Sequence, residues 1–178
     1  MSEYQFYDFA AVDCPLTKKQ MSQLRALSTR ARITPRRFTN TYHWGDFKGS
    51  PDEMMEDYFD AHLYTSNFGY RKLYLRVPAS VLSLASIENY LFEDCLEAWE
   101  SHGNLILKFT LNNEDGGSDW DDDYDWEGDH RESRYDDDYY RDDDYDDEDD
   151  DNWNDSPRSL DALLSLRDEL ANGDLRAL

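Results

Sequence analysis

One stretch of 42 residues, from Glu114 to Asp155, constrains the folding of this chain more than any other feature. It holds 23 acidic and 3 basic residues, whereas the rest of the chain holds 18 acidic and 15 basic residues and is close to neutral. Aliphatic residues are scarce in the stretch, so it buries too little apolar surface to offset the entropy of ordering its backbone. We therefore expect a long, acidic, disordered insertion beside a nearly neutral folded part.

The sequence on either side of the insertion predicts an α+β domain over residues 1–113 and a C-terminal helical segment over residues 156–178. Pro35 places one of the strands at a sheet edge or gives it a late start. We expect a mixed or antiparallel sheet covered by helices. Apolar, aromatic and β-branched patterns predict its strands at residues 4–12, 33–44, 72–77, 96–99 and 105–111.

Capping residues predict where the helices begin. Thr17 and Gln20 form a capping box before a helix that carries Leu24 on its apolar side. Ser50 and Pro51 predict a helix from residue 51 to about residue 64. Its apolar face would hold Met55, Tyr58, Phe59, His62 and Leu63, with Glu53, Asp57 and Asp60 on a solvated opposite face. His62 is expected to be a hydrogen-bonded core histidine.

Two further helices are predicted near the ends of the folded segments. Residues 81–91 favour a short helix, although its serines blur the boundaries. After Ser156 and Pro157 a leucine stripe predicts a helix that docks on the core and ends at Asn172-Gly173, and Asp174 caps a last turn.

The two cysteines and the N-terminus bear on the compartment. Cys14 and Cys95 lie far apart without metal-binding spacing, and we expect two small buried thiols. The N-terminus lacks a signal-peptide pattern, and no apolar run approaches the ~20 residues needed to cross a bilayer. We expect a cytoplasmic protein with no membrane contact, no cofactor and no metal site.

The loop from Tyr42 to Gly49 is the best candidate for a conventional site, because aromatic, titratable and glycine residues converge between a strand and a helix. His43, Asp46 and Lys48 could supply a base, an orienting carboxylate and an anion contact. The simpler interpretation is a tight glycine turn with its aromatics packed beneath it. The candidate binding residues here are Tyr42, His43, Trp44, Asp46 and Lys48.

A basic patch precedes this loop. Between Pro15 and Trp44 there are seven basic residues and no acidic one: Lys18, Lys19, Arg25, Arg30, Arg32, Arg36 and Arg37. One hypothesis is that Arg30, Arg32, Arg36 and Arg37 bind a partner or nucleic acid and that the acidic segment folds over the patch and screens it. The alternative is a solvated helix face.

The acidic segment itself allows three interpretations, because aromatic residues are interleaved with its carboxylates. It is a solvated disordered insertion, a mimic of the nucleic-acid backbone, or a weak multisite binder of divalent cations. The last lacks the geometry of a calcium loop. The aromatics are Trp120, Tyr124, Trp126, Tyr135, Tyr139, Tyr140, Tyr145 and Trp153.

Common enzyme signatures, among them the phosphate-binding and nucleophile-elbow motifs, are absent from the sequence. The segments Tyr42 to Gly49, Tyr58 to Tyr64 and Gly173 to Leu178 resemble a family of uncharacterised bacterial proteins with a YHWGDFKG-type loop. The resemblance spans the chain except the acidic insertion. It implies a longer natural protein that continues as helix past Leu178, and it brings no activity, cofactor or catalytic residue.

These observations predict a non-enzymatic interaction or accessory module with a protein partner, in which the acidic segment screens the basic patch. One alternative is a nucleic-acid mimic that acts on a DNA-binding protein. The other is an enzyme that uses His43 and Asp46. An enzyme needs a concave pocket with open polar groups at that loop, whereas a module would show the same residues packed and satisfied.

Overall fold

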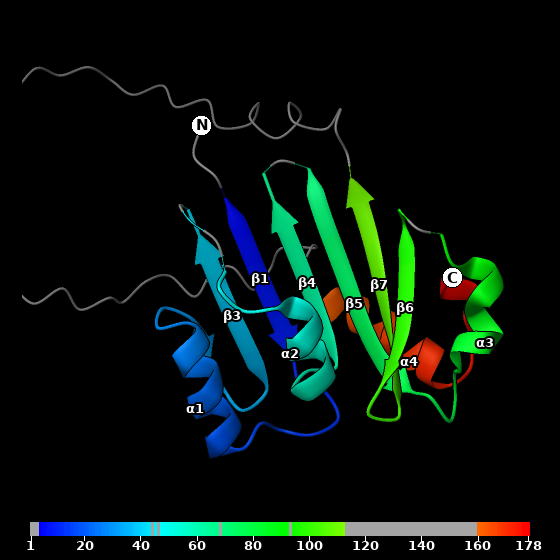
Figure 1. Ribbon diagram of the computed structural model, residues 1–178, viewed down its shortest axis with the longest axis horizontal. Coiled ribbons are helices and arrows are strands. Elements are labelled where there is room, and N and C mark those ends of the chain that lie inside the picture. The colour runs from blue at the N-terminus through cyan, green and yellow to red at the C-terminus, as the bar shows by residue number, and fades with distance from the viewer. Residues whose placement is uncertain (1–3, 44, 46, 68, 93, 113–159) are drawn as a thin grey trace, which may run out of the picture.

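The computed structural model describes residues 4–112, except 44, 46, 68 and 93, and residues 160–178. They form one antiparallel sheet of seven strands in the order β2-β3-β1-β4-β5-β7-β6, with helices packed against it (Figure 1). The predicted α+β class, with a sheet covered by helices, is confirmed. The acidic segment 114–155 lies outside the described residues.

The strands are β1 (Gln5–Ala10), β2 (Arg32–Ile33), β3 (Arg37–Tyr42), β4 (Ala61–Ser66), β5 (Tyr70–Pro78), β6 (Leu96–Ser101) and β7 (Asn104–Asn112). The α-helices are α1 (Lys18–Leu27), α2 (Pro51–Asp57), α3 (Leu84–Ile87) and α4 (Leu160–Ala171). Two 3₁₀ turns complete the description, η1 (Glu88–Tyr90) and η3 (Leu175–Ala177).

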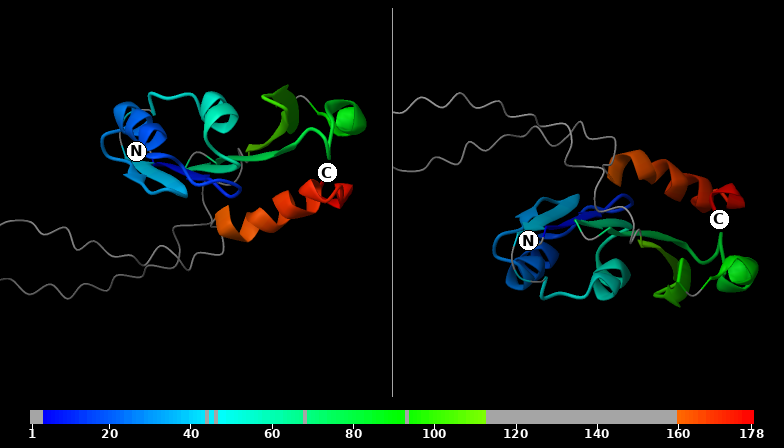
Figure 2. Two further views of the ribbon diagram at one scale, coloured as in Figure 1. Left: turned by 90° about the horizontal axis from the view of Figure 1, so that it is seen from below. Right: turned by 90° about the horizontal axis from the view of Figure 1, so that it is seen from above.

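The strand register gives the sheet two chemically different faces. On one face Phe9 lies between Phe38 and His62, and His62 pairs in turn with Tyr74. We call this the aromatic face; α1 and α2 cover part of it (Figure 2). The next position along each strand points the other way, because side chains alternate across a sheet.

The opposite face, the aliphatic face, is covered by α4 (Figure 2). Its central row runs through cross-strand partners Ala10, Ala61, Leu75 and Leu107. Leu160 and Leu170, near the two ends of α4, are fully buried against this face, and Ile87 of α3 is buried in the same cluster. The leucine stripe at the C-terminus thus packs on the sheet.

Two arginines tie α4 to the sheet. The Arg37 guanidinium donates to Asp8 in β1 at 2.6 and 2.8 Å and to Asp161 in α4 at 2.6 and 2.8 Å. Arg167, buried on α4, donates to the carbonyl oxygen of Arg76 at 2.8 Å and pairs with Asp13. These contacts hold both the first and the second half of α4 against the sheet.

The predicted helix from residue 51 to about residue 64 is wrong beyond its second turn, because α2 ends at Asp57 and the chain returns as β4. Asp60 is the reason. Its Oδ2 accepts hydrogen bonds from the amides of Val12 and Asp13, and its Oδ1 binds Arg76. Arg76 also donates to two carbonyl oxygens at the end of α2, which satisfies that helix end. Asp60 is therefore buried and paired, where a solvated face was predicted.

Two smaller expectations also change. Both Cys14 and Cys95 are exposed, where buried thiols were predicted, because Cys14 lies in the connection between β1 and α1 and Cys95 in the turn before β6. The strand predicted over residues 33–44 is divided into β2 and β3 by a turn at Pro35, which cannot donate to a ladder. The capping box of Thr17 and Gln20 forms as predicted.

Candidate functional site

The loop after β3 packs its described aromatics inward. The Tyr42 ring lies 5.8 Å from Tyr7 and 6.3 Å from Phe47, and Phe47 is buried. His43 is exposed, with its ring 5.7 Å from that of Tyr4, and Lys48 is exposed. Trp44 and Asp46 lie outside the described residues. His43 and Lys48 line neither of the cavities described below.

Three residues of the basic patch are engaged in internal contacts. Arg25 donates to the carbonyl oxygens of Thr29 and Ala31, at 2.9 and 2.6 Å. Arg36 donates to the carbonyl oxygen of Val12 at 2.7 Å. Arg37 binds the two carboxylates described above. These side chains hold loops and a helix in place.

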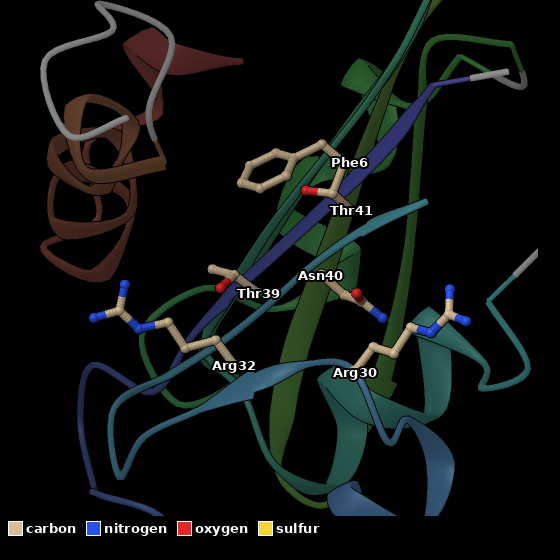
Figure 3. Close-up of a pocket in the computed structure, with 6 residues that line it drawn as sticks. All are labelled: Phe6, Arg30, Arg32, Thr39, Asn40 and Thr41. Carbon is tan, nitrogen blue, oxygen red and sulfur yellow. The ribbon is translucent and has the colours of Figure 1, made fainter. Parts of the chain in front are cut away.

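Arg30 and Arg32 line a shallow cavity of about 290 Å³ at the edge of the sheet, beside β3 (Figure 3). The two guanidinium groups extend to opposite sides of the strand in that view. Lys18 and Lys19 are exposed on the first turn of α1. The basic residues therefore do not converge on one point.

A second cavity, of about 320 Å³, lies on the aromatic face between α2 and strands β1, β4, β5 and β7. We call it the tyrosine hollow. It is lined by the start of α2 (Ser50, Pro51 and Asp52), by His62, by the lysines Lys72 and Lys108, and by the tyrosines Tyr7, Tyr64, Tyr70 and Tyr74. The strand register brings these residues together. Residues two apart along one strand lie on the same face, and so do cross-strand partners.

His62 is completely buried and stacks on Phe9, with ring centroids 3.7 Å apart. Its Nδ1 lies 2.9 Å from the carbonyl oxygen of Asp8 in the adjacent strand, so Nδ1 carries the proton and Nε2 is an acceptor. That Nε2 has no hydrogen-bond partner among the residues that the structure describes. Burial lowers the pKa of His62 to about 3 and keeps the ring neutral.

Tyr74, the cross-strand partner of His62, is also buried. Burial raises the pKa of the Tyr74 hydroxyl far above its usual value, and the negative charge of the nearby Asp52 carboxylate adds to the shift. The hydroxyl therefore stays protonated. Asp52 and the Nε2 of His62 are thus both acceptors at this part of the hollow.

Lysines line another part of the hollow. Lys108 lies 3.3 Å from a carboxylate oxygen of Glu97 and 5.9 Å from the centre of the Tyr74 ring. Lys72 is half-buried, is the cross-strand partner of Tyr64, and makes no ion pair with another described residue. Lys72 is therefore the cation best placed to meet an anion.

The hollow combines the apolar surface of tyrosine rings with a few hydrogen-bonding and charged groups, which is the usual composition of a small-molecule site. Within the described part of the chain, no cluster of three or more His, Cys, Asp or Glu side chains is placed to hold a metal ion. None of the described helices is long and apolar enough to span a membrane.

Comparisons with protein-family models, curated proteins and solved structures give no match for this chain.

The hollow was not predicted from the sequence. The alternation of Leu73 and Leu75 indicates one face of β5, whereas Tyr70, Lys72 and Tyr74 alternate on the other face. His62 was assigned to a helix. Tyrosine and lysine recurring at period two opposite a leucine row is the signal that identifies such a surface.

Proposed function

We propose that this chain is a non-enzymatic binding module whose recognition site is the tyrosine hollow and whose ligand is a small organic anion. The observation that carries the proposal is the Nε2 acceptor of His62, which has no partner among the described residues, on a cavity lined by tyrosines and lysines. A buried polar atom without a partner costs free energy, which a ligand that satisfies it would recover.

The titratable groups of the hollow favour binding over catalysis. An efficient general acid or base has a pKa near the working pH. The pKa of His62, about 3, makes it a weak base at neutral pH, and the raised pKa of Tyr74 makes that hydroxyl a weak acid. Both groups suit fixed hydrogen bonding.

The loop and the basic patch take secondary roles in this proposal. Tyr42 and Phe47 pack under the loop, and Arg36 and Arg37 are held by internal partners. The protein partner, the screening of the patch by the acidic segment, and catalysis by His43 and Asp46 stay predictions from the sequence.

The test uses the full chain and a panel of aromatic and aliphatic carboxylates, each added at increasing concentration while thermal unfolding is followed. A ligand that binds only the native state raises the unfolding temperature. We expect aromatic carboxylates to do so in the wild type and in Lys18→Met, an exposed lysine outside the hollow, and to lose most of the effect in Lys72→Met.

Two results would contradict the proposal. One is that no member of the panel changes the unfolding temperature at millimolar concentration. The other is that a bound member is converted to product, as followed by NMR spectra of the ligand. The first removes the site, and the second makes the protein an enzyme.

A further inference from the structure

The positions of His62 and Lys72 in the hollow deepen the proposed function, on which this inference rests. We infer that the ligand is a single aromatic ring that carries a hydrogen-bond donor at one end and an anionic group at the other. The donor meets the Nε2 of His62, and the anion meets Lys72.

The donor end follows from the tautomer of His62. Because Nδ1 donates back to the strand backbone, Nε2 is the ring nitrogen left to accept, and His62 lines the hollow. The Asp52 carboxylate, which also lines the hollow, is a second acceptor. Two acceptors repel a carboxylate or phosphate, so this end takes an O–H or N–H group.

The anionic end follows from Lys72. Lys72 and Tyr74 lie on the same face of β5, two residues apart, which corresponds to a separation of about 7 Å along the strand. Lys72 is unpaired within the described part of the chain, whereas Lys108 is neutralised by Glu97. An ammonium group at partial burial binds an anion more strongly than one in open water.

The lining of the hollow favours an aromatic ring between the two ends of the ligand. Tyr64 and Tyr70, on the strands that carry His62 and Lys72, line the same hollow. Their rings offer edges and faces that pack well against another aromatic ring.

The experiment measures the affinity of the full chain for three probes by isothermal titration calorimetry. 4-Hydroxybenzoate has both groups, benzoate lacks the donor, and 4-hydroxybenzamide lacks the charge. We expect 4-hydroxybenzoate to bind about tenfold more tightly than either of the others, since one hydrogen bond to a buried acceptor or one ion pair is worth about this factor.

Variants then assign each preference to a residue. His62→Phe keeps an aromatic ring on Phe9 and removes the acceptor, so the preference over benzoate should disappear. Lys72→Met should abolish the preference over 4-hydroxybenzamide. The matched controls are His43→Phe and Lys18→Met, which change the same residue types outside the hollow and should leave both preferences intact. If His62→Phe does not fold, the wild-type comparison of 4-hydroxybenzoate with benzoate decides alone.

The outcomes separate this inference from the proposed function. If benzoate binds as tightly as 4-hydroxybenzoate, the donor end is wrong, although the hollow remains a site for anions. If none of the three probes binds while other carboxylates of the panel do, the aromatic ring is wrong. If no carboxylate binds at all, both proposals fall.

Discussion

The two faces of the central sheet differ in how completely they are covered and in the side chains they carry. The aliphatic face meets α4, a helix of 12 residues, and its central row contains only alanine and leucine. The aromatic face meets α1 and α2, helices of 10 and 7 residues, and carries His62, Tyr74 and Lys72 where they leave it uncovered. The part of a face that a helix covers can be apolar, whereas an uncovered part keeps polar groups that water or a ligand can satisfy.

The boundary between α2 and β4 decides where His62 lies. Asp60 and Arg76 end α2 and send the chain back as β4, which places His62 in the sheet itself. The contact that overturned the predicted helix therefore places two lining residues of the hollow, His62 and Tyr64, on a strand.

The largest expected effect on stability tests how tightly the aliphatic face is packed. Leu107→Ala removes a fully buried side chain and should lower the free energy of unfolding by about 3 kcal/mol, through lost burial and a residual cavity. Leu111→Ala is the control on the same strand and face, with its side chain 58% exposed, and should change stability by less than about 0.5 kcal/mol. Equal losses in urea unfolding would mean that the aliphatic face is not packed as described.

The next effect tests the neutrality of His62 on the aromatic face. Its pKa is lowered to about 3, so below about pH 6.5 the unfolded chain takes up a proton that the folded ring does not. Stability should therefore fall as the pH falls, by about 2.5 kcal/mol between pH 6 and pH 4 from this residue alone.

The measurement for His62 is the urea midpoint at several pH values. His62→Phe should show a shallower decline than the wild type, whereas His43→Phe, at an exposed position, should follow the wild type. A decline of the same steepness in His62→Phe and the wild type would show that the ring takes up its proton in the native state.

A somewhat smaller effect tests the polar link between α4 and the sheet. Arg37→Met leaves the Asp8 carboxylate, 4% exposed, without its partner and should cost about 2 kcal/mol. Asp161→Asn weakens only the exposed half of the link and should cost about 0.5 kcal/mol. Chemical denaturation of both variants checks the ratio. If Asp161→Asn lost more unfolding free energy than Arg37→Met, the contact with α4 would be the more stabilising half of the link.

The smallest effect concerns the end of α4. Gly173 has a φ of 81°, a left-handed conformation that glycine adopts without strain and a side chain rarely does. Gly173→Ala should cost about 1 kcal/mol, and Gly173→Asn less, because asparagine tolerates this conformation better. Thermal unfolding of the two variants should rank them in that order, and a neutral alanine variant would contradict it.

The sequence predicted features that depend on neighbouring residues and missed those that depend on strand register. Thr17 with Gln20 and the alternating leucines of β7 carry their signals within a few residues, and both formed as expected. The boundary at Asp60 depends on amides 47 and 48 residues away and on Arg76 in another strand, so local periodicity could not indicate it. The hollow draws on four strands and a helix, and only the register shows that its residues meet.

The tautomer of His62 in the free protein at neutral pH tests the contrast between the two faces most directly. Nitrogen-15 NMR of the imidazole distinguishes a protonated from an unprotonated ring nitrogen. The account predicts a neutral ring with the proton on Nδ1 and a bare Nε2, whose resonance shifts when 4-hydroxybenzoate is added. A doubly protonated ring, or a proton on Nε2, would contradict it, because the hollow would then offer no acceptor.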